Sequence, residues 1–329
     1  MKKVFFTLLM LAVVTAVKAI EDNIVEIVYD GTTATVTIAD NISSYVSCSS
    51  GTSSHVVLTQ SSDFSGVDAT KDNEDGEIIY ALTGSSDDGE FFLTGSYKCS
   101  LELNGLTLTN PAGPAINLQN GKRVSVSAKK GTDNTLTDGA NDNYSGCYHC
   151  KGHTKFKGKG VLNVVGNSKH AVYCKEYVEV KNLTLNITGA IKDGIHCKEY
   201  FLMESGTVSI SGVGDDGIQV ELDGTTSTGE LEDHEEEDSG NFYMIDGELS
   251  ISDYKGKAVK ADGNVTFSGG TQSFDINDIE TEIEDILKPG NDDTEAVYNL
   301  QGRRVTVGQS QKGVYIIKSN NGVRKVLMK

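Results

Sequence analysis

The stretch HAVYCKEYVEVKNLTLNITGAIKDGIHCK at residues 170–198 decides the fold. It holds the motif VYCK at Val172–Lys175 and ends with IHCK at Ile195–Lys198, so like residues return after 23 positions. Between them, LTLNI at Leu183–Ile187 alternates apolar and polar residues, which is typical of a half-buried strand. A unit of this length made of short strands and turns cannot bury an apolar face alone. We therefore expect such units to stack.

The repeat extends on both sides of this stretch. Equivalent segments lie at Tyr148–Lys151, Ile218–Glu221 and Val259–Asp262, and the third positions of the five segments are 24, 23, 23 and 41 residues apart. The last spacing is 23 plus an 18-residue insertion, 224–241, which carries seven acidic residues and no Lys or Arg. This constant phase predicts an all-β fold, a right-handed parallel β-helix over residues 98–276. An antiparallel sandwich is the alternative, but it does not explain the phase.

The two ends of the chain differ from the repeat. Residues 1–19 begin with two lysines before an apolar run of about 14 residues, shorter than the ~20 that cross a bilayer, and they predict a secretory signal peptide. Residues 20–97 alternate in short strands and are interpreted as an N-terminal β-rich cap over the first coil. Residues 277–293 are interpreted as an acidic linker that includes a short helix, and residues 294–329 as a small C-terminal β-module.

Composition narrows the range of partners. Asp and Glu number 47 against 29 Lys and Arg, which gives a net charge of −18. Nucleic-acid binding draws most of its affinity from phosphate neutralisation, so neither nucleic acid nor an anionic membrane surface is expected as a partner. Trp is absent, which removes the indole platform from any sugar site, although 13 Tyr remain. No transmembrane segment is predicted after the leader.

The six cysteines are an even number in a chain with a leader, which by itself suggests disulfides. The repeat argues otherwise, because Cys150, Cys174 and Cys197 share one phase and alternate with outward residues. We expect these three to be packed, reduced thiols in the core. A CxxC ends at Cys150, but no second one follows, which argues against structural zinc. The sequence leaves the pairing of Cys48, Cys99 and Cys147 open.

Several segments carry a family resemblance. LNGLTLTN at Leu103–Asn110, NTLTD at Asn134–Asp138 and KADGNVTFSGG at Lys260–Gly270 occur in the order found in a family of exported bacterial carbohydrate-binding-domain proteins. The chain resembles this family over roughly residues 25–276. The resemblance implies a calcium-associated parallel β-helix with a shape similar to pectate lyases, and a polysaccharide partner. Parallel β-helices host lyases, binders and adhesins alike, so the fold alone does not choose among them.

The tail carries a second resemblance. VYNLQG at Val297–Gly302 and KGVYIIK at Lys312–Lys318 are similar to the C-terminal sorting domains of type IX secretion. That similarity implies passage across an outer membrane, with the secretion machinery as a partner. The expected location is therefore secreted or on the cell surface.

A calcium site is predicted near two turns of the repeat. Asp193 and Asp216 occupy one phase, Asp215 lies beside Asp216, and Glu221 faces outward from the same coil. Stacked carboxylates repel unless a cation bridges them, and converging oxygens suit Ca²⁺. Asp-Gly is also ordinary turn chemistry, so these residues are alternatively plain corners.

An outward strip of basic and aromatic residues is the predicted sugar-binding surface. Its members are His149, Lys151, Tyr173, Lys175, His196 and Lys198. Neighbouring ammonium groups repel, so a partner is expected. Glu176 and Glu199 would satisfy the lysines within the protein; alternatively, the strip binds the carboxylates of an acidic polysaccharide.

These features predict a secreted or surface-displayed, non-catalytic carbohydrate-binding protein that uses Ca²⁺. The first alternative is a calcium-dependent polysaccharide lyase, in which Lys169 or Lys192, or else Lys257, removes the proton alpha to a uronate carboxylate. Arg123 is the single Arg before the tail, which disfavours an Arg-based lyase site. The second alternative is a structural surface protein or adhesin. The acidic insertion is expected to be a solvated loop, or a weak collector of Ca²⁺.

Overall fold

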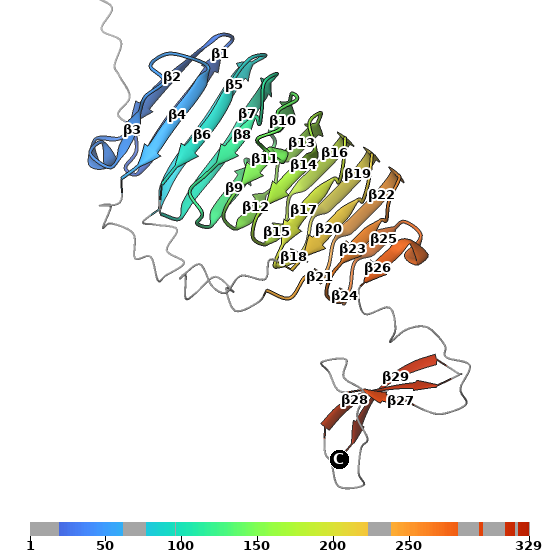
Figure 1. The fold of residues 1–329 in the computed structure, drawn as a ribbon. Helices are drawn as coiled ribbons and strands as arrows, with labels where there is room; N and C mark the ends of the chain where they lie inside the picture. Colours follow the sequence, from blue (N-terminus) through green and yellow to red (C-terminus); the bar gives the residue numbers. More distant parts are fainter. Residues whose placement is uncertain are drawn as a thin grey trace, which may run out of the picture.

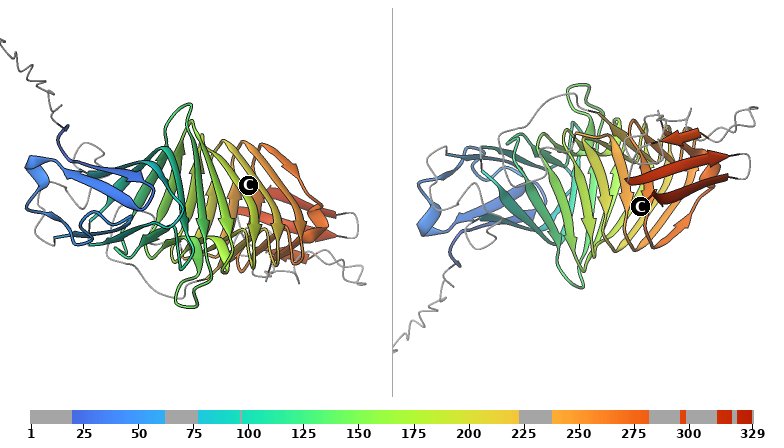
Figure 2. Two further views of the ribbon diagram at one scale, coloured as in Figure 1. Left: turned by 90° about the horizontal axis from the view of Figure 1, so that it is seen from above. Right: turned by 90° about the horizontal axis from the view of Figure 1, so that it is seen from below.

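The computed structural model describes residues 20–61, 77–95, 97–222 and 238–281, and the backbone of three strands in the tail. The predicted signal peptide and most of the acidic insertion lie outside these residues. The described chain winds into coils whose strands lie side by side along one axis, from the blue N-terminal end to the orange last coil (Figures 1 and 2). The predicted all-β parallel β-helix is confirmed.

Three parallel faces make up the helix, here called A, B and C. Face A holds β9 (Val124–Ala128), β12 (Thr154–Gly158), β15 (Val178–Lys181), β18 (Tyr200–Met203), β21 (Asn241–Met244) and β24 (Val265–Phe267). Face B holds β10 (Asp133–Asp138), β13 (Val161–Gly166), β16 (Thr184–Ala190), β19 (Thr207–Val213), β22 (Glu248–Tyr254) and β25 (Thr271–Ser273). Face C holds β4 (His55–Gln60), β6 (Glu90–Thr94), β8 (Ile116–Leu118), β11 (Gly146–Cys150), β14 (His170–Cys174), β17 (Ile195–Lys198), β20 (Ile218–Glu221), β23 (Val259–Ala261) and β26 (Ile279–Thr281).

The core lies between the three faces and follows the predicted phase. On face B, Leu185 pairs with Val208 and Ile187 with Ile210, and all four are buried. Each such side chain contributes roughly 1.5–3 kcal/mol when it leaves water, but only if a neighbouring coil covers it. Met203 pairs with Met244, so the register resumes across the acidic insertion as expected.

The cysteine ladder is confirmed in its register and burial. Cys150 pairs with Cys174, and Cys174 with Cys197; all three are fully buried free thiols. Cys99 and Cys147 are also buried and free, and Cys48 is half-buried and free. Burial raises the pKa of Cys197 well above its ordinary value. These thiols therefore pack as small apolar groups.

Parallel stacking begins earlier than residue 98. The long strands β1 (Ile24–Asp30), β5 (Ile78–Ser86) and β7 (Cys99–Asn110) pair in parallel, and β4 pairs in parallel with β6. Among the described residues at this end, only β2 (Thr33–Ile38), β3 (Val46–Cys48) and the short η1 (Asp40–Ile42) depart from the parallel arrangement. The part that departs from parallel stacking is thus smaller than residues 20–97. The sequence did not reveal the early coils, because two-stranded coils of unequal length carry no 23-residue period.

The other end of the helix also extends beyond its predicted limit. A short 3-10 turn, η3 (Ile276–Asp278), leads into β26, which pairs with β23 on face C. In the tail, β27 (Ala296–Tyr298), β28 (Gly313–Ser319) and β29 (Gly322–Met328) form a separate antiparallel sheet. Within the described residues, no helix is long and apolar enough to span a membrane.

Candidate functional site

The corner between faces B and C carries the predicted acidic residues. Asp193 and Asp216 each lie two residues before a face C strand, and stacking brings successive coils to about 4.8 Å. Glycine follows each of them for a packing reason: a Cβ on Gly194 would lie 2.6 Å from the Ile210 side chain. The glycines are therefore explained by close packing, and the aspartates by their contacts.

Asp193 is the centre of a buried cluster. Its Oδ2 lies 3.1 Å from Nδ1 of His170 and 3.0 Å from Nδ1 of His196, while its Oδ1 accepts a hydrogen bond from the Asp216 backbone. Burial raises the pKa of Asp193, but the hydrogen bonds from the two imidazoles outweigh it and hold the pKa well below its usual range. Burial lowers the pKa of His170, and the Asp193 carboxylate opposes that shift. Asp193 is thus a stable anion.

His170 was not predicted, because nothing in the sequence distinguishes it from a surface histidine.

Three carboxylates meet at the solvent edge of this corner. One oxygen from each of Asp193, Asp215 and Asp216 lies within 4.8 Å of the others. Burial raises the pKa of Asp216, and repulsion from Asp193 and Asp215 adds to the rise, although a hydrogen bond from the Lys257 backbone opposes it. Asp215 is exposed. An oxygen-rich, negatively charged site with an open side fits Ca²⁺, which takes carboxylate and water ligands.

Glu221, the fourth predicted ligand, has different neighbours. Its Oε2 lies 3.4 Å from Nε2 of His196 and 4.0 Å from Nζ of Lys198, and its Oε1 accepts a hydrogen bond from Gln219. Both nitrogens of His196 therefore face carboxylates, one from Asp193 and one from Glu221. His196 joins the predicted sugar strip to the acidic corner.

The aromatic members of the strip stack on one another along face C. The rings of His149 and Tyr173 lie 5.1 Å apart at 15°, and those of Tyr173 and His196 lie 5.5 Å apart at 22°. Burial lowers the pKa of His149 to about 4, with Lys151 and Lys169 adding to the shift. The ring faces, which a sugar would need as platforms, are turned toward neighbouring rings. The ladder presents ring edges outward.

The lysines of the strip are spread along the border of face C. Lys151 is exposed, while Nζ of Lys175 lies 3.8 Å from Glu176. The other lysines named as candidate bases lie near the acidic corner. Nζ of Lys169 donates to the Asp142 carbonyl at 3.1 Å, and Nζ of Lys257 lies 3.8 Å from Glu280. Lys192 is exposed, and its carbonyl accepts from the backbone of Asp215.

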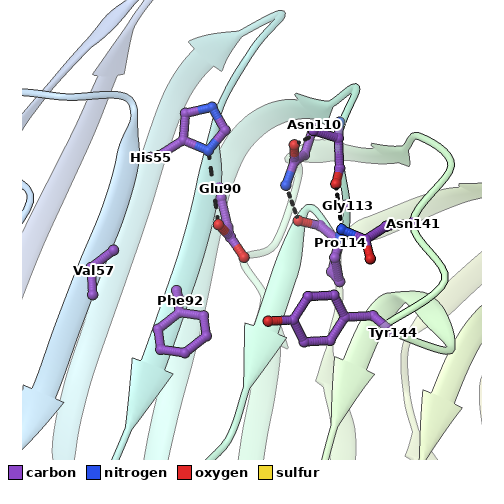
Figure 3. A pocket seen from close by; sticks show the side chains of 10 residues that line it. His55, Val57, Glu90, Phe92, Asn110, Gly113, Pro114, Asn141 and Tyr144 are labelled. Atoms are coloured by element: carbon purple, nitrogen blue, oxygen red, sulfur yellow. Dashed lines mark hydrogen bonds and ion pairs between the residues drawn. The ribbon is translucent and has the colours of Figure 1, made fainter.

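A groove of about 350 Å³ opens on face C and was not predicted (Figure 3). Phe92 and Tyr144 supply its aromatic walls, with polar lining from His55, Glu90, Asn110 and Asn141. Phe92 pairs with Asn117, which pairs with His149, and the Tyr144 ring meets His149 edge-on at 5.4 Å. The groove therefore runs into the aromatic ladder. Its lining comes partly from loops outside the repeat, so periodicity could not reveal it.

Side chains hold the loops of this groove in place. Nδ2 of Asn110 donates to the Pro114 carbonyl at 2.7 Å, and Nδ2 of Asn141 donates to the Ala112 carbonyl at 2.7 Å. Because both amides fix the backbone opposite Phe92, the groove is formed before any ligand binds. A preformed concave site with aromatic walls and a few polar groups is the usual form of a small-ligand or sugar site.

Comparisons with known proteins support the fold and identify a family. No curated protein matches the chain. A solved structure, described as the polysaccharide lyase-like protein from C. thermocellum in a gadolinium derivative, is similar, with a TM-score of 0.55 and 18% identity. The match covers 78% of this chain and 96% of that one, and it supports the fold. Residues 65–318 match the family described as carbohydrate-binding domain-containing protein. The chain belongs to this family of carbohydrate-binding domain-containing proteins.

Proposed function

We propose that the protein is a secreted or surface-displayed polysaccharide binder that is not catalytic and that uses Ca²⁺. One observation carries the proposal: the carboxylates of Asp193, Asp215 and Asp216 meet at the edge of the face that also bears the Phe92 and Tyr144 groove. A cation site and an aromatic groove on one face can contact one extended chain.

Calcium would be held chiefly by Asp215 and Asp216. Both oxygens of Asp193 already accept hydrogen bonds, so its main contribution is negative charge. When bound, Ca²⁺ supplies a positive charge that attracts the carboxylate of an acidic polysaccharide. Such a local attraction is needed because a protein at −18 repels polyuronates at long range. Exposed Lys151 adds a second, weaker attraction on the same face.

Several basic side chains that a lyase could use already contact other groups of the protein, which supports a non-catalytic function. The amines of Lys169 and Lys257 face a carbonyl and a carboxylate. Arg123 is 1% exposed, and its guanidinium lies 2.6 Å from buried Glu77. A calcium-dependent lyase is the second candidate, favoured by exposed Lys192 beside Asp215 and by the lyase-like name of the structural neighbour.

Export is part of the same proposal. It rests on the leader at residues 1–19 and on the tail that resembles a type IX sorting domain. The side chains of both segments lie outside the described residues, so the proposal depends on their sequence. The tail would be recognised by the outer-membrane secretion machinery.

Calorimetry with Ca²⁺, followed by polysaccharide binding, tests the proposal. We expect wild type to bind Ca²⁺ and Asp215→Asn to lose that binding, with Asp246→Asn, an exposed aspartate at another corner, as the matched control. Tyr144→Ala should weaken polysaccharide binding, while Tyr243→Ala on face A should not. Equal Ca²⁺ binding by all variants would contradict the metal assignment. Loss of glycan binding in Asn186→Ala, on face B, with no loss in Tyr144→Ala, would place the sugar surface elsewhere.

A further inference from the structure

A second buried cluster lies at the opposite edge of face C, where each coil passes into face A. His153, Glu176 and Glu199 come from three successive coils and are 0%, 3% and 4% exposed. One ligand atom from each lies within 4.8 Å of the other two, and Nε2 of His153 lies 3.3 Å from Oε2 of Glu199. This cluster takes no part in the proposed sugar site.

Each carboxylate of this cluster has one oxygen that accepts no hydrogen bond from the described residues. Oε2 of Glu176 and Oε2 of Glu199 are both buried, and neither has a hydrogen-bond partner within the described part of the chain. Buried polar atoms without a partner are rare and costly, at roughly 1–3 kcal/mol each. A missing ion is one of their recognised explanations.

The backbone and the neighbouring rings hold these side chains in place. Glu199 has φ 60°, the left-handed region that a non-glycine residue adopts at a cost. The ring of Tyr177 stacks on that of His153 at 4.3 Å and on that of Tyr200 at 4.7 Å. The strained turn and the stacked rings both hold in place the nitrogen and oxygen atoms that would bind a metal. Residues around metal sites commonly do this.

Two facing buried carboxylates require a positive charge or a proton between them. A shared proton would relieve the repulsion between the two carboxylates alone. A divalent cation would engage all three side chains at once. One nitrogen and two oxygens suit zinc or manganese, whereas Ca²⁺ prefers oxygen ligands alone.

We propose that His153, Glu176 and Glu199 form a structural site for a divalent transition-metal ion of the zinc and manganese type. The ion ties three successive coils together along the edge of the helix. Three protein ligands leave a position for water. The site is separate from the proposed calcium corner, which is built of oxygens at its open edge.

Zinc titration of the chelator-treated full chain tests this site. We expect one Zn²⁺ per chain to bind wild type and to raise the melting temperature, since an ion that binds only the native state stabilises it. Glu176→Gln, which keeps the shape of the side chain, should weaken that binding at least about 100-fold and abolish the rise. Asp246→Asn, an exposed aspartate outside both proposed metal sites, is the matched control and should leave both unchanged.

A second measurement distinguishes the loss of metal binding from a failure of the variant to fold. Co²⁺ in place of Zn²⁺ should give visible absorption in wild type and lose it in Glu199→Gln, whose fold is checked by circular dichroism. Equal Zn²⁺ and Mn²⁺ binding by wild type and Glu176→Gln would overturn the proposal. So would the absence of binding to wild type, which would leave Glu176 and Glu199 as a pair that shares a proton.

Discussion

Both edges of face C bury carboxylate groups, but the two edges differ in the hydrogen-bond partners of these groups. At one edge, the buried carboxylate of Asp193 faces two imidazoles and a backbone N–H, with Asp215 and Asp216 beside it. At the other, Glu176 and Glu199 face one imidazole, and an oxygen of each has no hydrogen-bond partner among the described residues. Both clusters are buried at the turns of neighbouring coils.

The difference lies in the number of donors available to each carboxylate. Asp193 accepts enough hydrogen bonds to stay ionised within the core, and its pKa is low because they outweigh burial. Glu176 has too few, so burial and Glu199 raise its pKa to about 8. Both oxygens of Asp193 therefore have hydrogen-bond partners, whereas Glu176 and Glu199 each have an oxygen with none among the described residues. Substitutions at the two edges should therefore have opposite effects on stability.

The largest effect is expected from Asp193→Ala. It removes the carboxylate that faces the imidazoles of His170 and His196 and that accepts from the Asp216 backbone. Breaking a buried, hydrogen-bonded charge cluster costs roughly 3–5 kcal/mol. Urea unfolding of the chelator-treated protein measures it. A loss of unfolding free energy below about 1 kcal/mol would show that the cluster does not stabilise the corner, and it would contradict the proposed difference between the two edges.

His149 should make the stability pH-dependent, because its buried imidazole has a lowered pKa of about 4. The unfolded pKa lies near 6.5, so the native state binds fewer protons, and stability should fall as pH drops from about 6.5 to about 4. The loss attributable to this residue is at most about 3 kcal/mol.

Unfolding free energies of wild type and His149→Gln across this pH range check the effect. The two proteins should converge as pH falls. Asp138, whose pKa burial raises to about 6, titrates in both and cancels in the difference. A difference that is independent of pH would mean that His149 is not held neutral.

At the glutamate edge, Glu176→Gln should stabilise the metal-free protein at neutral pH by roughly 1 kcal/mol. The amide removes one of two facing buried carboxyls and can donate to the oxygen of Glu199. Urea unfolding in chelator measures this gain, with Glu204→Gln, a more exposed glutamate that directly follows β18, as the control. Destabilisation by more than about 1 kcal/mol would mean that removing a carboxylate lowers stability at both edges, which would contradict the proposed difference.

The smallest effect is expected from Asp215→Asn. This exposed side chain should change the stability of the calcium-free protein by less than about 0.5 kcal/mol. It should nevertheless abolish the rise in melting temperature that Ca²⁺ gives wild type, since only a bound ligand stabilises the native state by mass action. A calcium-dependent rise of equal size in wild type and Asp215→Asn would return the three aspartates to plain turns.

Much of the fold could be predicted from the sequence, because an inward position repeats every 23 residues where coils stack. Cys174 and Cys197 identified that phase, and their pairing confirms it. The N-terminal coils were harder, because β1 and β5 are long strands that cross from face A to face B without this period.

The site was predicted less completely, since side-chain direction at a corner does not follow the alternation of a strand. The sequence placed Asp193, Asp215 and Asp216 in one region but assigned His196 to sugar contact rather than to Asp193. Glu176 lies 3.8 Å from Nζ of Lys175, as expected, but Glu199, at a left-handed turn, has a buried carboxylate that faces His153. Tyr144 lies in a loop that no repeat marks.

The most direct test of the proposed function is retention of the full chain on polygalacturonate, with and without a chelator, while ultraviolet absorbance follows the release of unsaturated ends. We predict retention that requires Ca²⁺, falls in Asp215→Asn and Tyr144→Ala, and releases no absorbing ends. Release of such ends in a calcium-dependent reaction that Lys192→Ala abolishes would contradict a non-catalytic binder and establish a lyase. Absence of both retention and cleavage, on this polymer and across a glycan array, would contradict polysaccharide binding itself.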